Sequence, residues 1–195
     1  SLFRCLAKGT DSPGRLFDAI NNELCETGTH GLFVTMVGGL FDPSTGKVIM
    51  ANAGHEPPLL LDGCGESFKS FEAEAPPLGI APGINGPEGY PSHEIDLEGG
   101  TFYIFTDGLT EATTFGSGML GNDGARALIR DHAQEDSDRQ LKSITGAVRL
   151  PGQSLRDDLT MLIIKDFGVD TDAAPRTPPP QNEDTPSGQI LRIRT

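Results

Sequence analysis

The chain of 195 residues has no Trp and only three cysteines, Cys5, Cys25 and Cys64, which lie far apart and show no CxxC spacing. An odd, sparse set of this kind argues against a disulfide framework and against a zinc site, and it is typical of a reducing compartment. We therefore expect a cytoplasmic protein. No apolar run approaches the roughly 20 residues that span a bilayer, and no signal-peptide pattern opens the chain. These absences predict no direct membrane contact from this segment.

Positive charge is also scarce. Fifteen Lys and Arg stand against 28 Asp and Glu, which gives a formal net charge of -13. Such a chain repels phosphate backbones and anionic lipid surfaces. This charge balance disfavours both nucleic-acid binding and association with an anionic membrane surface.

Hydrophobic residues make up 36% of the chain, while glycine and proline are frequent, at 25 and 15 residues. This composition implies many turns and favours strands joined by loops over a helical bundle. The usual motifs of covalent nucleophiles are missing as well: there is no G-x-S-x-G, no C-x5-R and no recognisable Ser/His/Asp pattern.

The stretch TFYIFTDGLTEA, residues 101–112, carries the first candidate site. Its first five residues form an uncharged run that predicts a strand buried on both faces, and Thr106-Asp107-Gly108 ends the run. Asp107 would then leave the core on rigid support, where a catalytic or metal-binding acid is best held. The alternative is that Asp-Gly is simply a turn.

A second acidic site precedes another apolar run. Asp157 and Asp158 stand directly before LTMLII, which predicts the last strand of the domain. If the two predicted strands are neighbours, the carboxylates of Asp107 and of this pair come together, and clustered oxygen ligands suit Mg2+ or Mn2+. Alternatively, Asp157 and Asp158 only cap a loop.

Helical patterns occur at the start of the chain and again late in it. An N-cap serine, a proline at the first helical position and apolar residues at helical spacing predict a helix over 13–25. The spacing of apolar residues over 125–132 predicts a second helix, with Asn122 or Asp123 as its cap, and a third follows over 137–148.

Strand patterns fill the region between these helices. Two hairpins are predicted over 32–53 and 58–71, and a strand over 93–97. A long loop is predicted over 72–89, and its length is typical of functional loops. The order predicts an α+β fold, a layered sandwich of mostly antiparallel sheets covered by helices. The proline-rich, acidic segment 169–195 is predicted to be a disordered tail or linker after a domain at 1–168.

Five strings occur together in the order and spacing of one known family. They are FVTMVGGLFDPSTGKV, ANAGHEPPLLL, APPLGI, FTDGLTEA and RDDLTMLII, spanning residues 33–165. In these strings the chain resembles the SpoIIE/RsbU-type serine/threonine phosphatases, the bacterial branch of the metal-dependent, type 2C-like protein phosphatases. The resemblance implies an α-β-β-α sandwich and hydrolysis of phosphoserine or phosphothreonine by a water bound to two Mn2+ or Mg2+ ions.

The resemblance also implies roles for single residues. Asp107 matches the metal-ligand aspartate of the TDG motif and Asp157 the ligand before the last strand, while Asp158 is a neighbouring candidate. Gly108 belongs to the metal-binding positions because a residue without a side chain lets the backbone approach the site. His55, in the AGH motif, has two alternative roles. It lies outside the ligand set and orients a metal-bound water or a carboxylate, or it fixes a local turn by hydrogen bonds.

One part of the family pattern has no match. Members carry a Gly-Asp strand and an Asp-x-x-Gly-His-Gly turn before the segment matching 13–25, and these supply the remaining metal ligands. The resemblance therefore covers about the C-terminal two thirds of a phosphatase domain, incomplete at its N-terminus. Sheet edges left open by the missing strands need a cover. A homo-oligomer or an exchanged strand is one such cover.

Two functions follow. The first is a protein phosphatase acting on a phosphorylated regulatory protein, such as an anti-sigma-factor antagonist, under an upstream sensor or receiver domain. The alternative is a non-catalytic phosphatase-like module that binds a partner, including through the loop 72–89.

Overall fold

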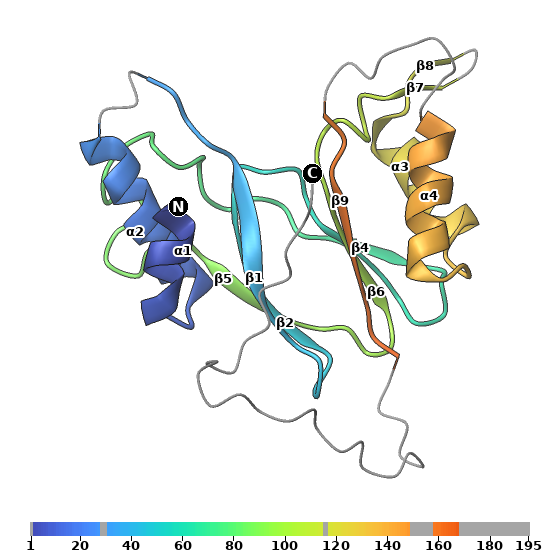
Figure 1. Cartoon of the computed structure of the whole chain (residues 1–195), viewed down its shortest axis with the longest axis horizontal. Coiled ribbons are helices and arrows are strands. Elements are labelled where there is room, and N and C mark those ends of the chain that lie inside the picture. The colour runs from blue at the N-terminus through green and yellow to red at the C-terminus, as the bar shows by residue number, and fades with distance from the viewer. Residues whose placement is uncertain (1, 28–30, 115–116, 149–157, 168–195) are drawn as a thin grey trace.

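The chain folds into four layers, two sheets face to face with a pair of helices outside each (Figure 1). The structure, a computed structural model, describes residues 2–27, 31–114, 117–148 and 158–167. The outer layers are α1 (Leu2–Leu6) and α2 (Pro13–Glu26) on one side, and α3 (Gly121–Asp131) and α4 (Ser137–Val148) on the other. The predicted tail, 169–195, lies outside the described residues.

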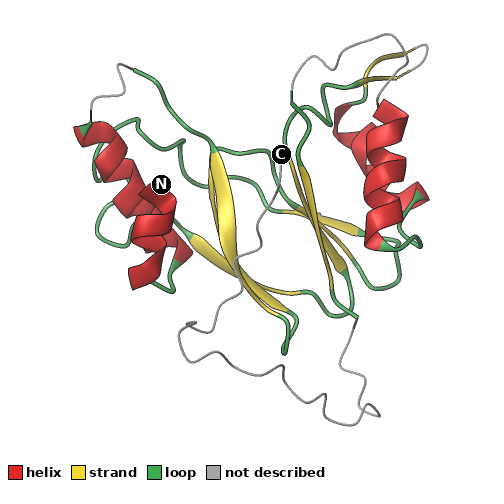
Figure 2. Ribbon diagram, in the orientation of Figure 1, coloured by secondary structure: helices red, strands yellow, loops and turns green. Residues whose placement is uncertain are grey.

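The two sheets between these helices are antiparallel throughout (Figure 2). The first has the order β1-β2-β5, formed by Met36–Asp42, Lys47–Ala53 and Ser92–Asp96. The second has the order β4-β3-β6-β9, formed by Phe68–Ser70, Leu59–Leu61, Thr101–Phe105 and Met161–Lys165. Within the described ranges, β1 and β5 are therefore the edges of the first sheet, and β4 and β9 are the edges of the second.

The predicted α+β sandwich is confirmed, and so are both hairpins. The first hairpin pairs Met36 with Ala53 and Asp42 with Lys47, and the second pairs Leu59 with Ser70. The predicted strand over 93–97 is β5, which pairs with β2. In the described part of the chain, no helix combines the length and the apolar character needed to cross a membrane.

Helix α2 begins where its sequence predicts. The hydroxyl of Ser12 accepts a hydrogen bond from the backbone N–H of Arg15 at 3.4 Å, and Pro13 occupies the first turn. The helix buries Leu16, Phe17 and Ile20 against the first sheet. Its apolar stripe thus fixes the helix on that sheet.

The cap predicted for α3 is wrong. The helix begins at Gly121, whose φ of +66° favours glycine, and neither Asn122 nor Asp123 caps it. A small hairpin of β7 (Thr113–Thr114) and β8 (Ser117–Met119) was also not predicted, because its residues are small and polar. The start of the chain, for which no register was predicted, forms α1 and a short 3-10 turn, η1 (Ala7–Gly9).

The hydrophobic core has three parts that match the layers. One lies between α2 and the first sheet, one between the sheets, and one between the second sheet and the pair α3 and α4. Strand β6 contributes to two of them: Phe102 packs between the sheets, and Tyr103 packs on the helix side. Successive residues of a strand point to opposite faces, so an apolar run of this kind needs both faces buried.

A buried hydrogen bond ties α4 to β6. Gln140 donates from Nε2 to the hydroxyl of Tyr103 at 2.9 Å, and both side chains are fully buried. Burial raises the pKa of the Tyr103 phenol above its usual range. The neutral phenol is thus favoured in the folded state, and its contribution to stability is lost as the pH rises above about 10.

We expect Tyr103→Phe to lower the free energy of unfolding by about 1–3 kcal/mol, because it removes the closer acceptor of the buried Gln140 amide and leaves only the long contact to the Ile129 carbonyl at 3.5 Å. The double variant Tyr103→Phe with Gln140→Leu should recover part of this loss, since both partners then become apolar. Urea unfolding of the wild type, both single variants and the double variant measures the coupling. Additive losses would contradict a direct interaction.

Candidate functional site

The candidate site lies where β6 ends and β9 begins. The two strands are antiparallel neighbours with Phe105 opposite Met161, so the chain after Phe105 runs beside the chain before Met161. The pairing continues one step further: the N–H of Thr106 donates to the carbonyl of Thr160 at 3.1 Å. The neighbouring strands that would bring the two acidic sites together are therefore present.

The side chain of Thr106 closes this end of the sheet. Its hydroxyl donates to the carbonyl of Asp158 at 2.8 Å and accepts from the N–H of Thr160 at 3.0 Å. One hydroxyl thus binds two backbone groups of the segment that carries Asp158. The backbone at Asp158 is therefore held by these hydrogen bonds as well as by the pairing of β9 with β6.

Gly108 brings the turn after β6 against the same segment. A Cβ atom at this position would lie 2.7 Å from the carbonyl oxygen of Asp158 and 3.2 Å from Cα of Leu159. Since real Cβ atoms do not approach a backbone oxygen so closely, only glycine fits here without a shift. The structure therefore places Asp107 and Asp158 on two chain segments that touch.

The turn that carries Asp107 is braced by its own backbone. The carbonyl of Asp107 accepts from the N–H of Glu111 at 2.8 Å and from the hydroxyl of Thr110 at 3.1 Å. The Asp107 side chain is exposed and makes no hydrogen bond or ion pair with the described residues. A carboxylate held on a rigid turn and facing solvent is available to a cation or a substrate.

Glu56 is a third acid at this edge, and sequence reasoning did not single it out. The hydroxyl of Thr110, which is buried, lies 3.4 Å from Oε1 of Glu56. This contact joins the turn after β2 to the turn after β6. Its position in the string AGHEPP, directly after His55, was the available signal.

His55 makes local contacts. The backbone N–H of His55 donates to Oδ1 of the buried Asn52 at 2.9 Å, and Nδ2 of Asn52 donates to the backbone carbonyl of His55 at 3.2 Å. The ring Nδ1 of His55 lies 3.2 Å from the carbonyl oxygen of Glu56. These bonds fit the alternative in which His55 belongs to a fixed turn. A role for its ring beside a metal or water stays a prediction.

The carboxylates present fit part of a site for a hard cation. Asp107 and Asp158 lie on touching segments and Glu56 lies nearby, but within the ranges that the structure describes no three acidic, histidine or cysteine side chains are grouped to hold a metal ion. Asp157 lies outside the described residues. A metal at this edge would need ligands in addition to those that the described residues supply.

Comparison with known protein families gives one match that covers most of the chain. The sequence model of the family "Stage II sporulation protein E (SpoIIE)" matches residues 1–166. A comparison with curated proteins gave no significant match.

Three solved structures illustrate the similarity in fold. The RsbU and RsbW domains of Rv1364c from Mycobacterium tuberculosis are 24% identical with a TM-score of 0.60, over 84% of this chain and 44% of that chain. The SiaA PP2C domain of Pseudomonas aeruginosa is 20% identical with a TM-score of 0.65, over 84% and 66%. The phosphatase domain of SpoIIE from Bacillus subtilis is 14% identical with a TM-score of 0.57, over 92% and 76%.

These structural likenesses confirm the fold. The chain spans less than two thirds of the length of the first two chains that it matches.

We expect Gly108→Ala to lower the free energy of unfolding by about 1–3 kcal/mol, because the added methyl group forces the Asp158 backbone away from the turn. Gly146→Ala is the matched control. Gly146 lies on the exposed side of α4 with no atom near the position of a Cβ, so alanine there should stabilise the helix by up to about 1 kcal/mol. Equal midpoints of chemical unfolding for the two variants would contradict the close approach at Gly108.

Proposed function

Since the chain belongs to the SpoIIE family, we propose that it is the larger part of a metal-dependent protein phosphatase domain that hydrolyses phosphoserine or phosphothreonine on a regulatory protein. The observation that carries this proposal is the contact between the turn of Asp107 and the segment of Asp158 at the end of β6 and β9. It gathers carboxylates on rigid support at one edge of the sandwich.

The chemistry of these residues suits the proposal. In this proposal Asp107 and Asp157 are ligands to Mn2+ or Mg2+, Asp158 is a further candidate ligand, and Gly108 lets the two segments approach. A pair of divalent cations, when bound, activates a water for attack and neutralises charge on a phosphoryl group. Thr106 and Thr110 hold the backbone on which Asp107 and Asp158 stand, through the hydrogen bonds to the Asp158 and Asp107 carbonyls.

The substrate in this proposal is a small phosphorylated protein of the anti-sigma-factor-antagonist kind, and an upstream sensor or receiver domain controls the activity. The formal charge of -13 supports a protein rather than a nucleic acid as the partner. One similar structure contains an RsbU domain together with an RsbW domain, which supports a place among protein-based regulators.

A non-catalytic phosphatase-like module is the second candidate. It is favoured by the described acids, which do not form a group of three that could hold a metal ion. A metal site with half of its ligands binds weakly, because each missing ligand removes binding free energy. The module would keep the fold and bind its partner without hydrolysis.

We expect Mn2+-dependent hydrolysis of p-nitrophenyl phosphate, reduced by roughly 100-fold or more in Asp107→Asn, because loss of even an indirect partner of a metal costs about 10–100-fold. Asp158→Asn should lower the rate as well if it is a ligand. Asp11→Asn, an exposed aspartate before α2, is the matched control and should leave the rate unchanged. If folded wild-type protein at saturating Mn2+ shows no hydrolysis, the proposed phosphatase function is rejected and the non-catalytic module remains.

A further inference from the structure

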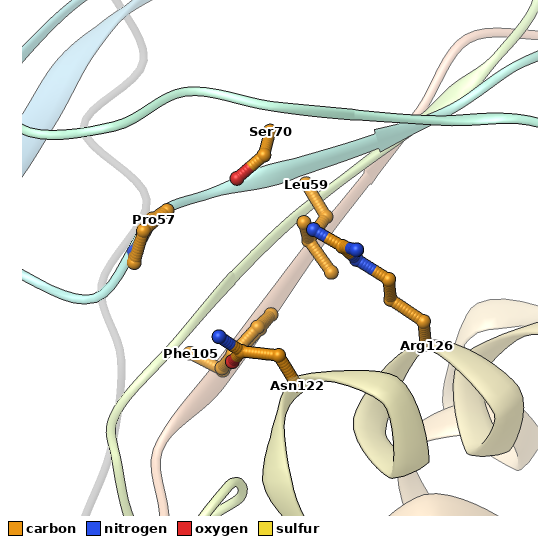
Figure 3. A pocket seen from close by; sticks show the side chains of 6 residues that line it. All are labelled: Pro57, Leu59, Ser70, Phe105, Asn122 and Arg126. Carbon is orange, nitrogen blue, oxygen red and sulfur yellow. The ribbon is translucent and has the colours of Figure 1, made fainter.

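A small pocket opens between α3 and the second sheet (Figure 3). Its walls are Pro57 before β3, Leu59 in β3, Ser70 in β4, Phe105 in β6, and Asn122 and Arg126 in α3. Residues 122 and 126 are four apart, so they lie on one face of the helix. The side chain of Arg126 extends from α3 toward Leu59, and that of Asn122 points toward Phe105 (Figure 3).

Arg126 has no partner for its charge among the described residues. Its Nε atom is buried and makes no hydrogen bond, and the guanidinium forms none of the ion pairs found in the described part of the chain. A buried donor without an acceptor costs free energy, and a charged one costs more. The residue as a whole is half buried, so its unmet Nε donor lies at the wall of the pocket and not sealed inside the protein. In a chain with 28 acidic residues, an arginine without an acidic partner points to an acceptor from outside.

The other polar groups of the pocket do not compete for such an acceptor. The side chain of Asn122 is exposed, does not cap α3, and makes no hydrogen bond with the described residues. The hydroxyl of Ser70 donates to Oε1 of Glu72 at 2.9 Å, so it is already committed to an exposed carboxylate at the rim. Arg126 and Asn122 therefore supply the free donors of the pocket.

The apolar walls strengthen what these donors can do. Pro57, Leu59 and Phe105 line the pocket, and Leu59 and Phe105 are buried. Hydrogen bonds from a guanidinium to an ionised oxygen are about twice as strong as neutral ones, and they gain further where water is excluded. Arginine also presents a planar fork that matches carboxylate and phosphate.

The pocket borders the candidate site. Pro57 directly follows Glu56, and Phe105 stands two residues before Asp107, which puts the Cα atoms of Phe105 and Asp107 within about 7 Å. The pocket and the acidic edge thus share the turn after β2 and the end of β6.

We propose that the pocket formed by Arg126 and Asn122 is an oxyanion subsite that holds a carboxylate or phosphate group of the protein bound at the acidic edge. The binding of an oxyanion is inferred from the donors of the pocket alone. The identification of its carrier as the phosphatase substrate rests on the proposed function.

The first experiment measures oxyanion binding on the whole chain without any metal. The Nε–Hε signal of Arg126, assigned by its disappearance in Arg126→Gln, is followed by NMR during titration with inorganic phosphate, acetate and chloride at constant ionic strength. We expect a saturable shift with phosphate or acetate and none with chloride. Identical responses to all three salts, or no response, would overturn the proposal.

The control variant is Glu72→Gln, which tests whether Arg126 instead pairs with Glu72 at the pocket rim. Under the proposal, removal of this competing charge leaves oxyanion binding equal or tighter. If Glu72→Gln moves the Arg126 signal as phosphate does, and added phosphate then has no effect, the partner of Arg126 is internal and the subsite is rejected.

The second experiment identifies the carrier through the binding of fluorescent serine-phosphorylated peptides, again without metal. One peptide has an acidic residue beside the phosphoserine, its twin has alanine there, and a third is unphosphorylated. Arg126→Gln should weaken binding roughly tenfold, the loss expected for one charge-assisted hydrogen bond. Arg126→Lys should recover only part of it, because lysine lacks the planar fork.

The three peptides separate the two sources of the oxyanion. An Arg126-dependent difference between the acidic and alanine peptides assigns a carboxylate, and one between the phosphorylated and unphosphorylated peptides assigns the phosphate. Equal binding of all peptides to the wild type and to Arg126→Gln would contradict the subsite. Because no turnover is measured, this result is independent of whether Asp107 supports hydrolysis.

Discussion

The pairing of β6 with β9 is the interaction on which the rest of the structure depends. Its register, Phe105 opposite Met161, fixes Phe102 toward the core between the sheets and Tyr103 toward the helices. A slip of one residue would exchange the two faces of the strand and expose both side chains to the wrong layer. The same register decides that the segment of Asp158 stops beside the turn of Asp107, and Thr106 and Gly108 then lock the two together.

Three turns meet at this edge, and each is held from inside the molecule. Asn52 fixes the turn after β2, Thr110 links that turn to the one after β6, and Thr106 fixes the segment before β9. Rigid supports thus carry Asp107, Asp158 and Glu56 at this edge, and Arg126 of α3, whose Nε has no hydrogen-bond acceptor among the described residues, lines the neighbouring pocket.

Local signals predicted the elements well, and contacts between distant segments were the part they missed. Hairpins, the helix over 13–25 and the buried strand over 101–105 follow from periodicity, turn residues and caps, and the structure confirms them. The start of α3 was wrong because Gly121, with its positive φ, begins the helix before Asn122 or Asp123 could cap it. Glu56 was missed because its contact with Thr110 joins segments that are far apart in the sequence. Arg126 was missed because only the folded structure brings α3 to the pocket beside Phe105.

The arrangement of the sheets also bears on how the acidic edge could be completed. Within the described ranges β9 is an edge strand, and its residues are all only half buried despite an apolar sequence. An edge strand offers a row of free backbone groups, and a further strand would lie about 4.8 Å away along its length. Such a strand would end beside Asp158, so one pairing could cover the apolar edge and carry new oxygen ligands to the acids.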